Sequence, residues 1–378
     1  MIEENKIKIN FENKENKISK KLEVFYNPIM KFNRDCSIIL LNSIVKKALI
    51  IGLPLSGSGI RGLRLLKELK KSKIKEIYFN DYKENFNNII KQNIEINKIK
   101  INKEKIKVSN KDANIFILES KGFDYIDLDP FGTPNPFLDA SVKRISREGI
   151  LAITATDTSA LAGTYPKATA RKYFARPLRN YLMHETGLRI LIRKIQLIGA
   201  QYDKALIPIF SYSKDHYYRI FFRNEKGKSK VDQILKQHKY FIYCPKCMNF
   251  FVDRFNQKEC CNKRMEFVGP LWVGKLFDEK LTRKIKKSSY NNIIGIENKE
   301  NIKFMDLLCK EALSNIDDVG FYEIPEIMKK YKINNCKKMD NTLNSLKKKK
   351  FKAVRTHFGK QGIKTNAKIE DVIKAMKN

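Results

Sequence analysis

The stretch Phe123-Asp124-Tyr125-Ile126-Asp127-Leu128-Asp129-Pro130-Phe131-Gly132-Thr133-Pro134 alternates apolar side chains with aspartates and then turns. The alternation predicts a short strand, and the Pro-Phe-Gly-Thr-Pro run predicts a tight turn directly after it. Pro130 holds Asp129 near extended geometry and has no backbone N–H group. The corner therefore offers carboxylate and carbonyl acceptors beside the ring of Phe131, an arrangement that suits an amino group on a planar heterocycle. The alternative is an ordinary strand exit in which Asp129 caps a turn.

Length and charge limit the class of protein. A chain of 378 residues exceeds the usual size of one core, so we expect two domains. The 76 Lys and Arg against 41 Asp and Glu give a formal net charge of +35. Such a charge predicts a polyanionic partner. The excess of Lys, Ile and Asn is also typical of compositional drift, which would add lysines without selecting a binding face.

The sequence predicts neither a signal peptide nor a membrane-spanning segment. The first residues lack the apolar core of a signal peptide, and the longest apolar run, Ala48 to Leu55, is too short to cross a bilayer. We therefore expect a soluble cytoplasmic protein with no membrane partner. Seven cysteines in such a chain argue against a disulfide framework, so clustered cysteines are candidate metal ligands.

A glycine turn lies between a predicted buried strand, Ala48 to Gly52, and a predicted helix. Gly57, Gly59 and Gly62 have the spacing G-x-G-x-x-G, which lets a ligand approach the backbone at a helix N-terminus. Asp81 follows the next predicted strand, 22 positions after Gly59. At this distance an acidic residue accepts hydrogen bonds from a ribose diol.

Strands and helices alternate through the first half of the chain. Further strands are predicted around residues 77–79, 106–108, 123–128 and 149–156, with a helix over 85–97. This order predicts an α/β fold with a doubly wound, mostly parallel sheet and a ligand above the carboxyl ends of the strands.

Glycine turns of this kind bind three classes of ligand. A phosphate-binding P-loop requires Lys after the last glycine, where Leu63 stands. A nicotinamide cofactor suits the glycines and Asp81 as well as S-adenosylmethionine does. The corner at Asp129 favours methylation of an exocyclic amine, because hydride transfer does not require acceptors there.

Taken together, several segments resemble the tRNA guanine-26 N2-dimethyltransferases of archaea and eukaryotes. The resemblance runs from about residue 22 to the C-terminus. The matching segments are Phe25 to Pro28, Asn33 to Asp35, Ser56 to Arg64, Asp127 to Pro134, Gly163 to Lys167, His184 with Glu185, Leu188 to Leu191, Gly269 to Trp272 and Thr356 to Phe358.

The resemblance implies a class I S-adenosylmethionine methyltransferase that makes N2-methylguanine and then N2,N2-dimethylguanine in tRNA. It implies a catalytic corner of Asp129, Pro130 and Phe131. The implied cofactor residues are Arg34, Arg61, Asp81, Asp112 and Ala113, together with Gly57 and Gly59 of the glycine turn.

The same resemblance divides the chain into three parts. We expect a basic and polar segment over residues 1–22, a methyltransferase domain over 23–215 and a smaller α+β tRNA-binding domain over 216–378. We expect a monomer. A nucleic-acid-binding protein that keeps the fold without catalysis is the alternative from a different class, and intact Asp129 and Asp81 argue against it.

Cysteines in the C-terminal part form a candidate zinc site. Cys244 and Cys247 have the C-x-x-C spacing of a zinc knuckle, and Cys260 and Cys261 follow after twelve residues. The second pair is adjacent, whereas a zinc ribbon has intervening residues. The fourth ligand is therefore open between Cys260 and His238, and reduced cysteines in a hairpin are the alternative.

The remaining C-terminal segments are basic. Residues 278–302 are rich in Lys and Asn and predict a linker or long loop. Helices over 323–332 and 341–350, followed by a strand over 351–358, predict a winged-helix-like end. Residues 331–378 hold 13 Lys and one Arg against two Asp and one Glu, which suits either a surface for an RNA backbone or a solvated tail. Arg171, Arg176 and Arg179 are further candidates for RNA contact.

Overall fold

The computed structural model describes residues 1–10, 25–100, 104–288 and 290–377. These residues form two compact units. Unit 1 comprises Met1–Thr156, Phe221–Lys226 and Arg283–Ile302, and unit 2 comprises Asp157–Ile220, Gly227–Thr282 and Lys303–Asn378. Unit 2 thus begins before the predicted division at residue 215, and the functional division of the chain stays a prediction.

The strands are β1 Ile2–Glu4, β2 Ile7–Ile9, β3 Leu49–Leu53, β4 Ile74–Asn80, β5 Ile106–Ser109, β6 Phe123–Leu128, β7 Ile145–Ala155, β8 Lys204–Lys214, β9 Tyr217–Lys226, β10 His238–Tyr243, β11 Phe250–Asp253, β12 Glu259–Cys260, β13 Lys263–Arg264, β14 Glu266–Trp272, β15 Tyr322–Glu323, β16 Ala353–Arg355 and β17 Gly362–Thr365.

The α-helices are α1 Lys31–Ser43, α2 Ile60–Glu68, α3 Phe86–Ile96, α4 Ala113–Glu119, α5 Leu138–Arg144, α6 Thr158–Leu161, α7 Pro166–Tyr173, α8 Met183–Ala200, α9 Lys228–Leu235, α10 Glu279–Lys287, α11 Tyr290–Ile294, α12 Lys299–Ala312, α13 Ile324–Tyr331, α14 Met339–Lys348 and α15 Ile369–Met376. Three short 3₁₀ helices are η1 Pro28–Met30, η2 Lys71–Lys73 and η3 Asn135–Phe137.

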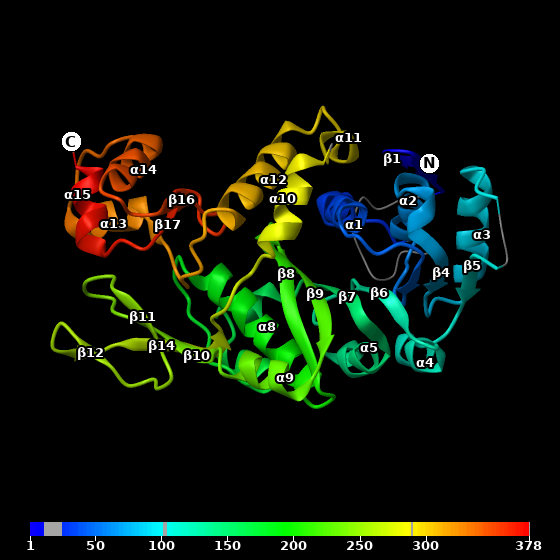
Figure 1. The fold of residues 1–378 in the computed structure, drawn as a ribbon, viewed down its shortest axis with the longest axis horizontal. Coiled ribbons are helices and arrows are strands. Elements are labelled where there is room, and N and C mark those ends of the chain that lie inside the picture. Colours follow the sequence, from blue (N-terminus) through cyan, green and yellow to red (C-terminus); the bar gives the residue numbers. More distant parts are fainter. Residues whose placement is uncertain (11–24, 101–103, 289, 378) are drawn as a thin grey trace. The chain divides into compact units, whose positions relative to one another are not determined.

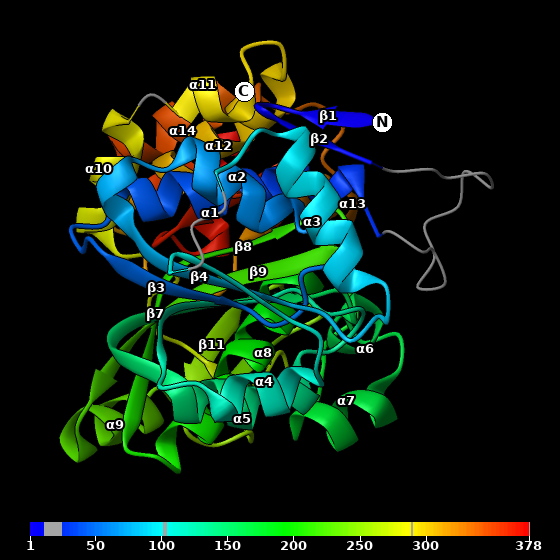
Figure 2. The same ribbon diagram turned by 90° about the vertical axis from the view of Figure 1, so that its right-hand side faces the viewer.

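The largest sheet confirms the predicted doubly wound fold. Its strand order is β5-β4-β3-β6-β7-β9-β8, and β5, β4, β3, β6 and β7 pair in parallel. In unit 1, α1 and α2 cover one face of these strands, and α4 and α5 cover the other (Figure 2). Because both faces are covered, a central strand such as β6 is buried along almost its whole length. The carboxyl ends of the parallel strands therefore share one edge, as predicted.

The glycine turn between β3 and α2 depends on backbone freedom. Gly57 and Gly59 have φ values of +54° and +76°, in the left-handed region that favours glycine. Gly62 has a different role, because a Cβ atom there would lie 2.2 Å from Cε1 of Phe79 on β4. The third glycine thus lets α2 pack closely on the sheet.

The first ten residues belong to the fold of unit 1, which their polar composition did not indicate. β1 and β2 form an antiparallel hairpin in which Ile7 and Ile9 are fully buried. The backbone N–H of Lys8 donates to Oδ1 of Asn97 at 2.8 Å, which joins the hairpin to the end of α3. The rest of the predicted N-terminal segment, residues 11–22, lies outside the described residues.

The linker predicted over residues 278–302 is wrong, because this range contains α10, α11 and the start of α12. On α10, Leu281 and Ile285 are buried, while the lysines of the same helix lie toward solvent. The four-residue spacing of Leu281 and Ile285 is typical of a helix. The many lysines around them gave the segment the composition of a linker.

The C-terminal end has the predicted order of two helices followed by a strand, but that strand, β16, covers only Ala353–Arg355 of the predicted range 351–358. Within unit 2, α13 and α14 precede β16 and β17, and the small sheet has the order β15-β17-β16 (Figure 1). A second small sheet, β11-β10-β14, precedes it in the chain. Across the part of the chain that the structure describes, no helix has the length and apolar character needed to cross a membrane.

Candidate active site

The predicted site residues of unit 1 follow the carboxyl ends of neighbouring parallel strands. Asp129 follows β6, Asp81 follows β4, and the glycine turn follows β3. Asp112 lies beyond the end of β5, at the start of α4. In a doubly wound sheet this edge is where ligands bind.

Arg61 connects Asp129, at the corner after β6, to α1. Its Nη2 forms an ion pair with Asp129, and its Nη1 lies 3.4 Å from Oδ2 of Asp127. The same guanidinium donates to Oδ1 of Asn33 at 2.9 Å and to Oγ of Ser37 at 3.0 Å. Arg61 is largely buried, whereas the Asp129 side chain keeps 22% of its surface exposed. The Asp129 carboxylate is thus held by Arg61 and stays partly exposed at the corner.

The turn after Asp129 is held by backbone contacts. The N–H of Gly132 donates to Oγ1 of Thr156 at 2.7 Å, and the N–H of Thr156 donates to the carbonyl of Gly132 at 2.9 Å. Pro130 is buried. Phe131 is 43% exposed, and its ring centroid lies 4.5 Å from that of Phe25 in an edge-to-face arrangement. An aromatic surface is therefore available beside the carboxylate.

Asp81 and the glycine turn lie together, as their spacing predicted. Oδ2 of Asp81 accepts the N–H of Gly57 at 2.7 Å, and Oδ1 accepts the N–H of Lys83 at 3.2 Å. Asp81 is half-buried. This carboxylate both holds the turn and remains accessible to a ligand diol.

Asp112 and Ala113 begin α4. Oδ1 of Asp112 accepts the N–H groups of Asn114 and Ile115 at 2.8 and 3.2 Å, so it caps the helix. Ala113 is buried in the first turn. Capping alone is sufficient to explain an aspartate at position 112. A cofactor contact at Asp112 and Ala113 stays a prediction.

Arg34 lies in a buried ion-pair cluster with the N-terminal hairpin. Its Nε donates to Oε1 of Glu4 at 2.8 Å, and Nη1 of Arg64 donates to the same oxygen at 2.8 Å. Arg64 also pairs with Asp35 at 2.7 Å, and the hydroxyl of Tyr26 donates to Glu4 at 3.0 Å. Burial raises the pKa of Glu4, but Arg34 and Arg64 outweigh it and lower the pKa to about 2. Arg34 is thus paired with Glu4, and its cofactor role stays a prediction.

Sequence reasoning missed Glu4, Ser37 and Asp127 as members of these networks. Asn33 and Ser37 lie four residues apart, so one face of α1 presents both to Arg61. The alternation around Ile7 and Ile9 was the signal for a strand pair near Glu4. No local signal connects Glu4 to Arg34 and Arg64, because the contacts span 30 and 60 residues.

Residues 5–377 match the family described as N2,N2-dimethylguanosine tRNA methyltransferase. The chain belongs to this family. One relative in it is the tRNA (guanine(26)-N(2)/guanine(27)-N(2))-dimethyltransferase of Aquifex aeolicus, which is 41% identical over 369 residues, covering 95% of this chain and 91% of the relative. A second is the tRNA (guanine(26)-N(2))-dimethyltransferase of Saccharolobus solfataricus, 38% identical over 94% of this chain and 91% of the relative.

A solved structure supports the same assignment. Trm1 from Pyrococcus horikoshii, in complex with S-adenosyl-L-methionine, is similar with a TM-score of 0.86 and 34% identity, covering 100% of this chain and 99% of that one. The resemblance read from the motifs is confirmed, and so is the predicted class I methyltransferase fold.

In this family member the four predicted cysteine ligands lie together in unit 2. The sulfur atoms of Cys244, Cys247, Cys260 and Cys261 all lie within 4.8 Å of one another. Adjacent cysteines on a strand would point apart, but Cys261 has a φ of +55° in the turn between β12 and β13. The Sγ atoms of Cys260 and Cys261 are therefore only 3.8 Å apart. His238, the other candidate ligand, instead has Nε2 at 2.9 Å from Oε1 of Gln196.

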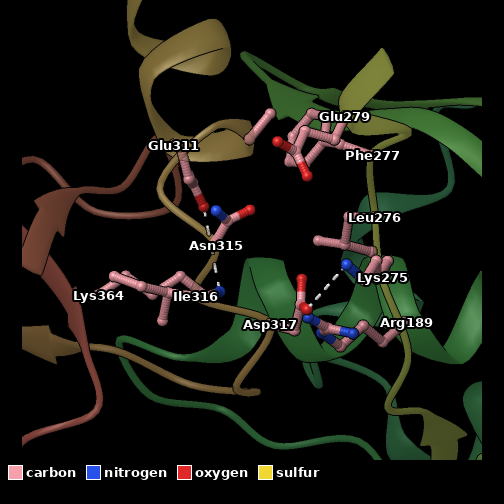
Figure 3. A pocket seen from close by; sticks show the side chains of 11 residues that line it. Arg189, Lys275, Leu276, Phe277, Glu279, Glu311, Asn315, Ile316, Asp317 and Lys364 are labelled. Carbon is pink, nitrogen blue, oxygen red and sulfur yellow. Dashed lines mark ion pairs between the residues drawn. The ribbon is translucent and has the colours of Figure 1, made fainter. Parts of the chain in front are cut away.

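A polar pocket in unit 2 is too small for a substrate. Its cavity of about 30 Å³ lies among Arg189, Glu311, Asp317 and Lys364 (Figure 3). Such a volume holds about one water molecule. Arg189 donates to Glu185 at 2.9 Å, and Lys364 lies 2.8 Å from the same buried carboxylate. The charges around this pocket are paired, so the family's chemistry is better sought at Asp129.

Proposed function

We propose that this chain transfers one and then two methyl groups from S-adenosylmethionine to the exocyclic N2 of guanine 26 in tRNA. The observation that carries the proposal is the Asp129 carboxylate held by Arg61 beside the exposed ring of Phe131, in a chain of the dimethyltransferase family. The Pyrococcus horikoshii relative with S-adenosyl-L-methionine supports the methyl donor.

The residues suit that donor. S-adenosylmethionine, when bound, supplies a methyl group on a positively charged sulfonium. Gly57 and Gly59 leave the backbone open to a ligand at the start of α2, and Asp81 offers a carboxylate for the ribose diol. A nicotinamide cofactor would suit the same two features, but neither the family nor the acceptor at Asp129 favours it.

Asp129 acts on the attacking amine. The N2 lone pair of guanine is delocalised into the ring, so the amine must be oriented toward the methyl carbon. The Asp129 carboxylate accepts an N–H of this amine and takes its proton as the new nitrogen–carbon bond forms and the sulfur–carbon bond breaks. Holding the amine nitrogen and the methyl carbon at about 3–3.5 Å lowers the activation barrier, because the two groups no longer have to meet by diffusion.

The guanine leaves the RNA stack to reach this corner. Base extrusion costs a few kcal/mol, and stacking on an aromatic ring returns about 1–3 kcal/mol. Phe131 supplies such a ring, since 43% of its surface is exposed. The ring thus holds the base in place while Asp129 holds its amine.

The test is a methylation assay with unmodified tRNA and isotope-labelled S-adenosylmethionine, followed by mass spectrometry of the nucleosides. The expected product is N2-methylguanosine that is converted to N2,N2-dimethylguanosine. Transcripts with adenine at position 26, at position 27 or at both define the site, because the Aquifex aeolicus relative is named for both positions. Calorimetry should detect binding of S-adenosylhomocysteine and no comparable binding of NADH. A chain that transfers no methyl group to any transcript would contradict the proposal.

We also propose that Cys244, Cys247, Cys260 and Cys261 hold one structural zinc ion. Four thiolates around zinc at about 2.3 Å have sulfur–sulfur distances of about 3.8 Å, and the pairs Cys247–Cys260 and Cys260–Cys261 are 3.4 and 3.8 Å apart. Bound zinc would join β10 to the hairpin of β12 and β13.

Elemental analysis of the purified protein should find about one zinc per chain, and Cys247→Ser should release it and lower the melting temperature. Cys336→Ser is the matched control, because Cys336 lies outside the cluster. Protein that is fully folded with no zinc would contradict the metal site. Cys260→Ser tests the adjacent cysteine separately, and retained zinc there would remove it from the ligand set.

The tRNA partner, a monomeric state and a cytoplasmic location belong to the same proposal. Light scattering of the active protein should give the mass of one chain, 44.2 kDa. A dimer as the active species would contradict this part.

A further inference from the structure

Unit 2 contains a second pocket that shares no residue with the candidate active site. Its cavity of about 490 Å³ is lined by nine residues, of which five lie on one segment: Arg176, Pro177, Leu178, Arg179 and Asn180. The others come from β10, β14 and the loop that begins the cysteine cluster: Tyr243, Pro245, Glu266 and Phe267. This volume falls in the range of small-molecule sites, about 300–1,000 Å³, so one nucleotide fits it.

Arg176 is fixed over an aromatic ring. Its guanidinium carbon lies 4.6 Å from the centroid of Phe267, in a cation–π contact. The backbone N–H of Arg176 donates to the carbonyl of Gly269 at 2.9 Å, and the N–H of Gly269 donates back at 2.8 Å. This bridge joins the arginine segment to β14 and fixes the backbone from which the guanidinium extends to the Phe267 ring. A planar guanidinium is a surface on which bases stack.

Arg179 supplies a second cation three residues later. Both arginines are exposed, and within the described residues neither forms an ion pair. Exposed basic residues continue on the neighbouring segments, with Lys246 beside Pro245, and Lys263 and Arg264 on β13. A guanidinium without an acidic partner can bind a phosphate in a bidentate manner.

We propose that this pocket binds one unpaired nucleotide of the tRNA substrate, outside the base that is methylated. The base stacks on the Arg176 plane, and Arg179 binds the adjacent phosphate. Asn180 and Glu266 line the same cavity and offer an amide and a carboxylate to base edges. The proposal rests on the proposed function, because it takes tRNA as the partner. It adds a second point of attachment for the same tRNA substrate.

An RNA nucleotide suits the pocket better than an acidic peptide does. A peptide carboxylate would use the two cations but not the flat, preformed Arg176–Phe267 pair. Glu266 would also repel such a carboxylate, whereas it accepts N–H groups of a base. The combination of stacking plane, cation and acceptor is the one by which proteins bind single-stranded nucleotides.

The experiment compares Arg176→Ala, Arg179→Ala and Arg176→Lys with the parent chain, using unmodified tRNA. We expect each alanine variant to raise the KM for tRNA about tenfold and to change kcat less than twofold, with unchanged affinity for S-adenosylhomocysteine. Arg179→Ala should also lower the slope of log affinity against log salt by about one. Arg176→Lys keeps the charge but loses the plane, so it should raise KM without changing the slope.

Arg254→Ala is the matched control, because Arg254 is exposed in the same unit and does not line the pocket. Melting temperatures confirm that each variant is folded. An active parent whose pocket variants behave like Arg254→Ala would overturn the inference while leaving the proposed function intact. A parent that methylates no tRNA would instead overturn the proposed function.

Discussion

The contact between Arg61 and Asp129 orients the carboxylate that we propose acts on the guanine amine. Asp129 stands at the end of β6 with one oxygen paired to Arg61, and Arg61 is itself held by Asn33 and Ser37 from α1. Three elements thus orient one carboxylate. An acceptor oriented before the substrate arrives needs less reorganisation during the reaction.

Asp129→Ala should lower kcat by roughly 10²-fold or more, because it removes a positioned acceptor or base. Affinities for tRNA and S-adenosylhomocysteine should stay within a few-fold of the parent, and single-turnover methylation together with calorimetry measures both. Asp129→Asn keeps one acceptor oxygen and removes the charge. Partial activity of this variant would indicate orientation of the amine, and full loss would indicate proton acceptance.

Asp124→Ala is the control for the previous change, since Asp124 lies on the same strand but pairs with Lys46 at 2.7 Å. It should leave kcat nearly unchanged. If Asp129→Ala methylates tRNA at the parental rate, the corner after β6 is not the catalytic site.

Phe131→Ala should raise the KM for tRNA and leave S-adenosylhomocysteine affinity unchanged. Its ring is exposed and should recover about 1–3 kcal/mol by stacking on the extruded base. Phe131→Tyr keeps the aromatic face and should restore most of the affinity. Equal KM values for the alanine variant and the parent would show that the ring does not hold the base.

At the scale of elements, the N-terminal hairpin stabilises unit 1 through one buried carboxylate. Glu4 on β1 reaches Arg34 on α1 and Arg64 on α2, and its side chain is 1% exposed. Removing one partner of a buried ion cluster leaves uncompensated charge, which costs about 3–5 kcal/mol. The hairpin therefore contributes more to stability than its short strands suggest.

This cluster makes stability depend on acid pH. The pKa of Glu4 falls from 4.5 to about 2 on folding, so the folded state favours the charged form. The resulting stability is complete above pH 4.5 and is lost as pH falls toward 2, by about 3 kcal/mol in total. Urea unfolding at pH 6 and pH 3 measures the larger part of this loss, about 2 kcal/mol, because pH 3 is still above the folded pKa.

Glu4→Gln is the comparison, because it removes the titrating group. The variant should be less stable at pH 6 and should lose less free energy of unfolding between pH 6 and pH 3 than the parent. Glu311, whose pKa is also lowered to about 2, leaves some pH dependence in both proteins. The same loss in the variant and the parent would contradict the role of Glu4.

At the scale of the whole molecule, the charge of +35 predicts strongly salt-dependent binding of tRNA. Residues 331–378 carry much of this charge, but they cannot be deleted to test it. Lys364 in this range is buried and pairs with Glu185 at 2.8 Å, and Thr356 donates to Glu311 at 2.9 Å. Deletion would remove Lys364 from Glu185 and the contacts of Thr356 and His357 from Glu311, and both carboxylates are buried, so substitution is the sharper test.

Lys347→Gln combined with Lys349→Gln should lower the slope of log affinity for tRNA against log salt by up to about two. Both side chains are exposed at the end of α14. Lys228→Gln with Lys230→Gln, also exposed, is the matched control for the lost charge. Binding titrations at several salt concentrations give the slopes. Equal slopes for the two double variants would indicate that the C-terminal lysines reflect composition only.

The sequence by itself determined the features that depend on neighbours along the chain. The alternation before Asp129, the glycine spacing from Gly57 to Gly62 and the position of Asp81 after its strand were all readable, because a parallel sheet brings successive strand ends to one edge. The contact between Asp81 and Gly57 at 2.7 Å follows from that geometry. Composition misled where lysines covered a helical pattern, as in α10, and where polar residues covered a hairpin, as in β1 and β2.

Tertiary structure decided which charges meet. Arg34 and Arg61 are both arginines near the start of helices, yet one pairs with Glu4 from the hairpin and the other with Asp129 from β6. Likewise, Cys260 and Cys261 join one cluster only because a positive φ at Cys261 turns their side chains together. A buried charge must find a partner, and the nearest one in space is set by packing between distant segments, which no local pattern records.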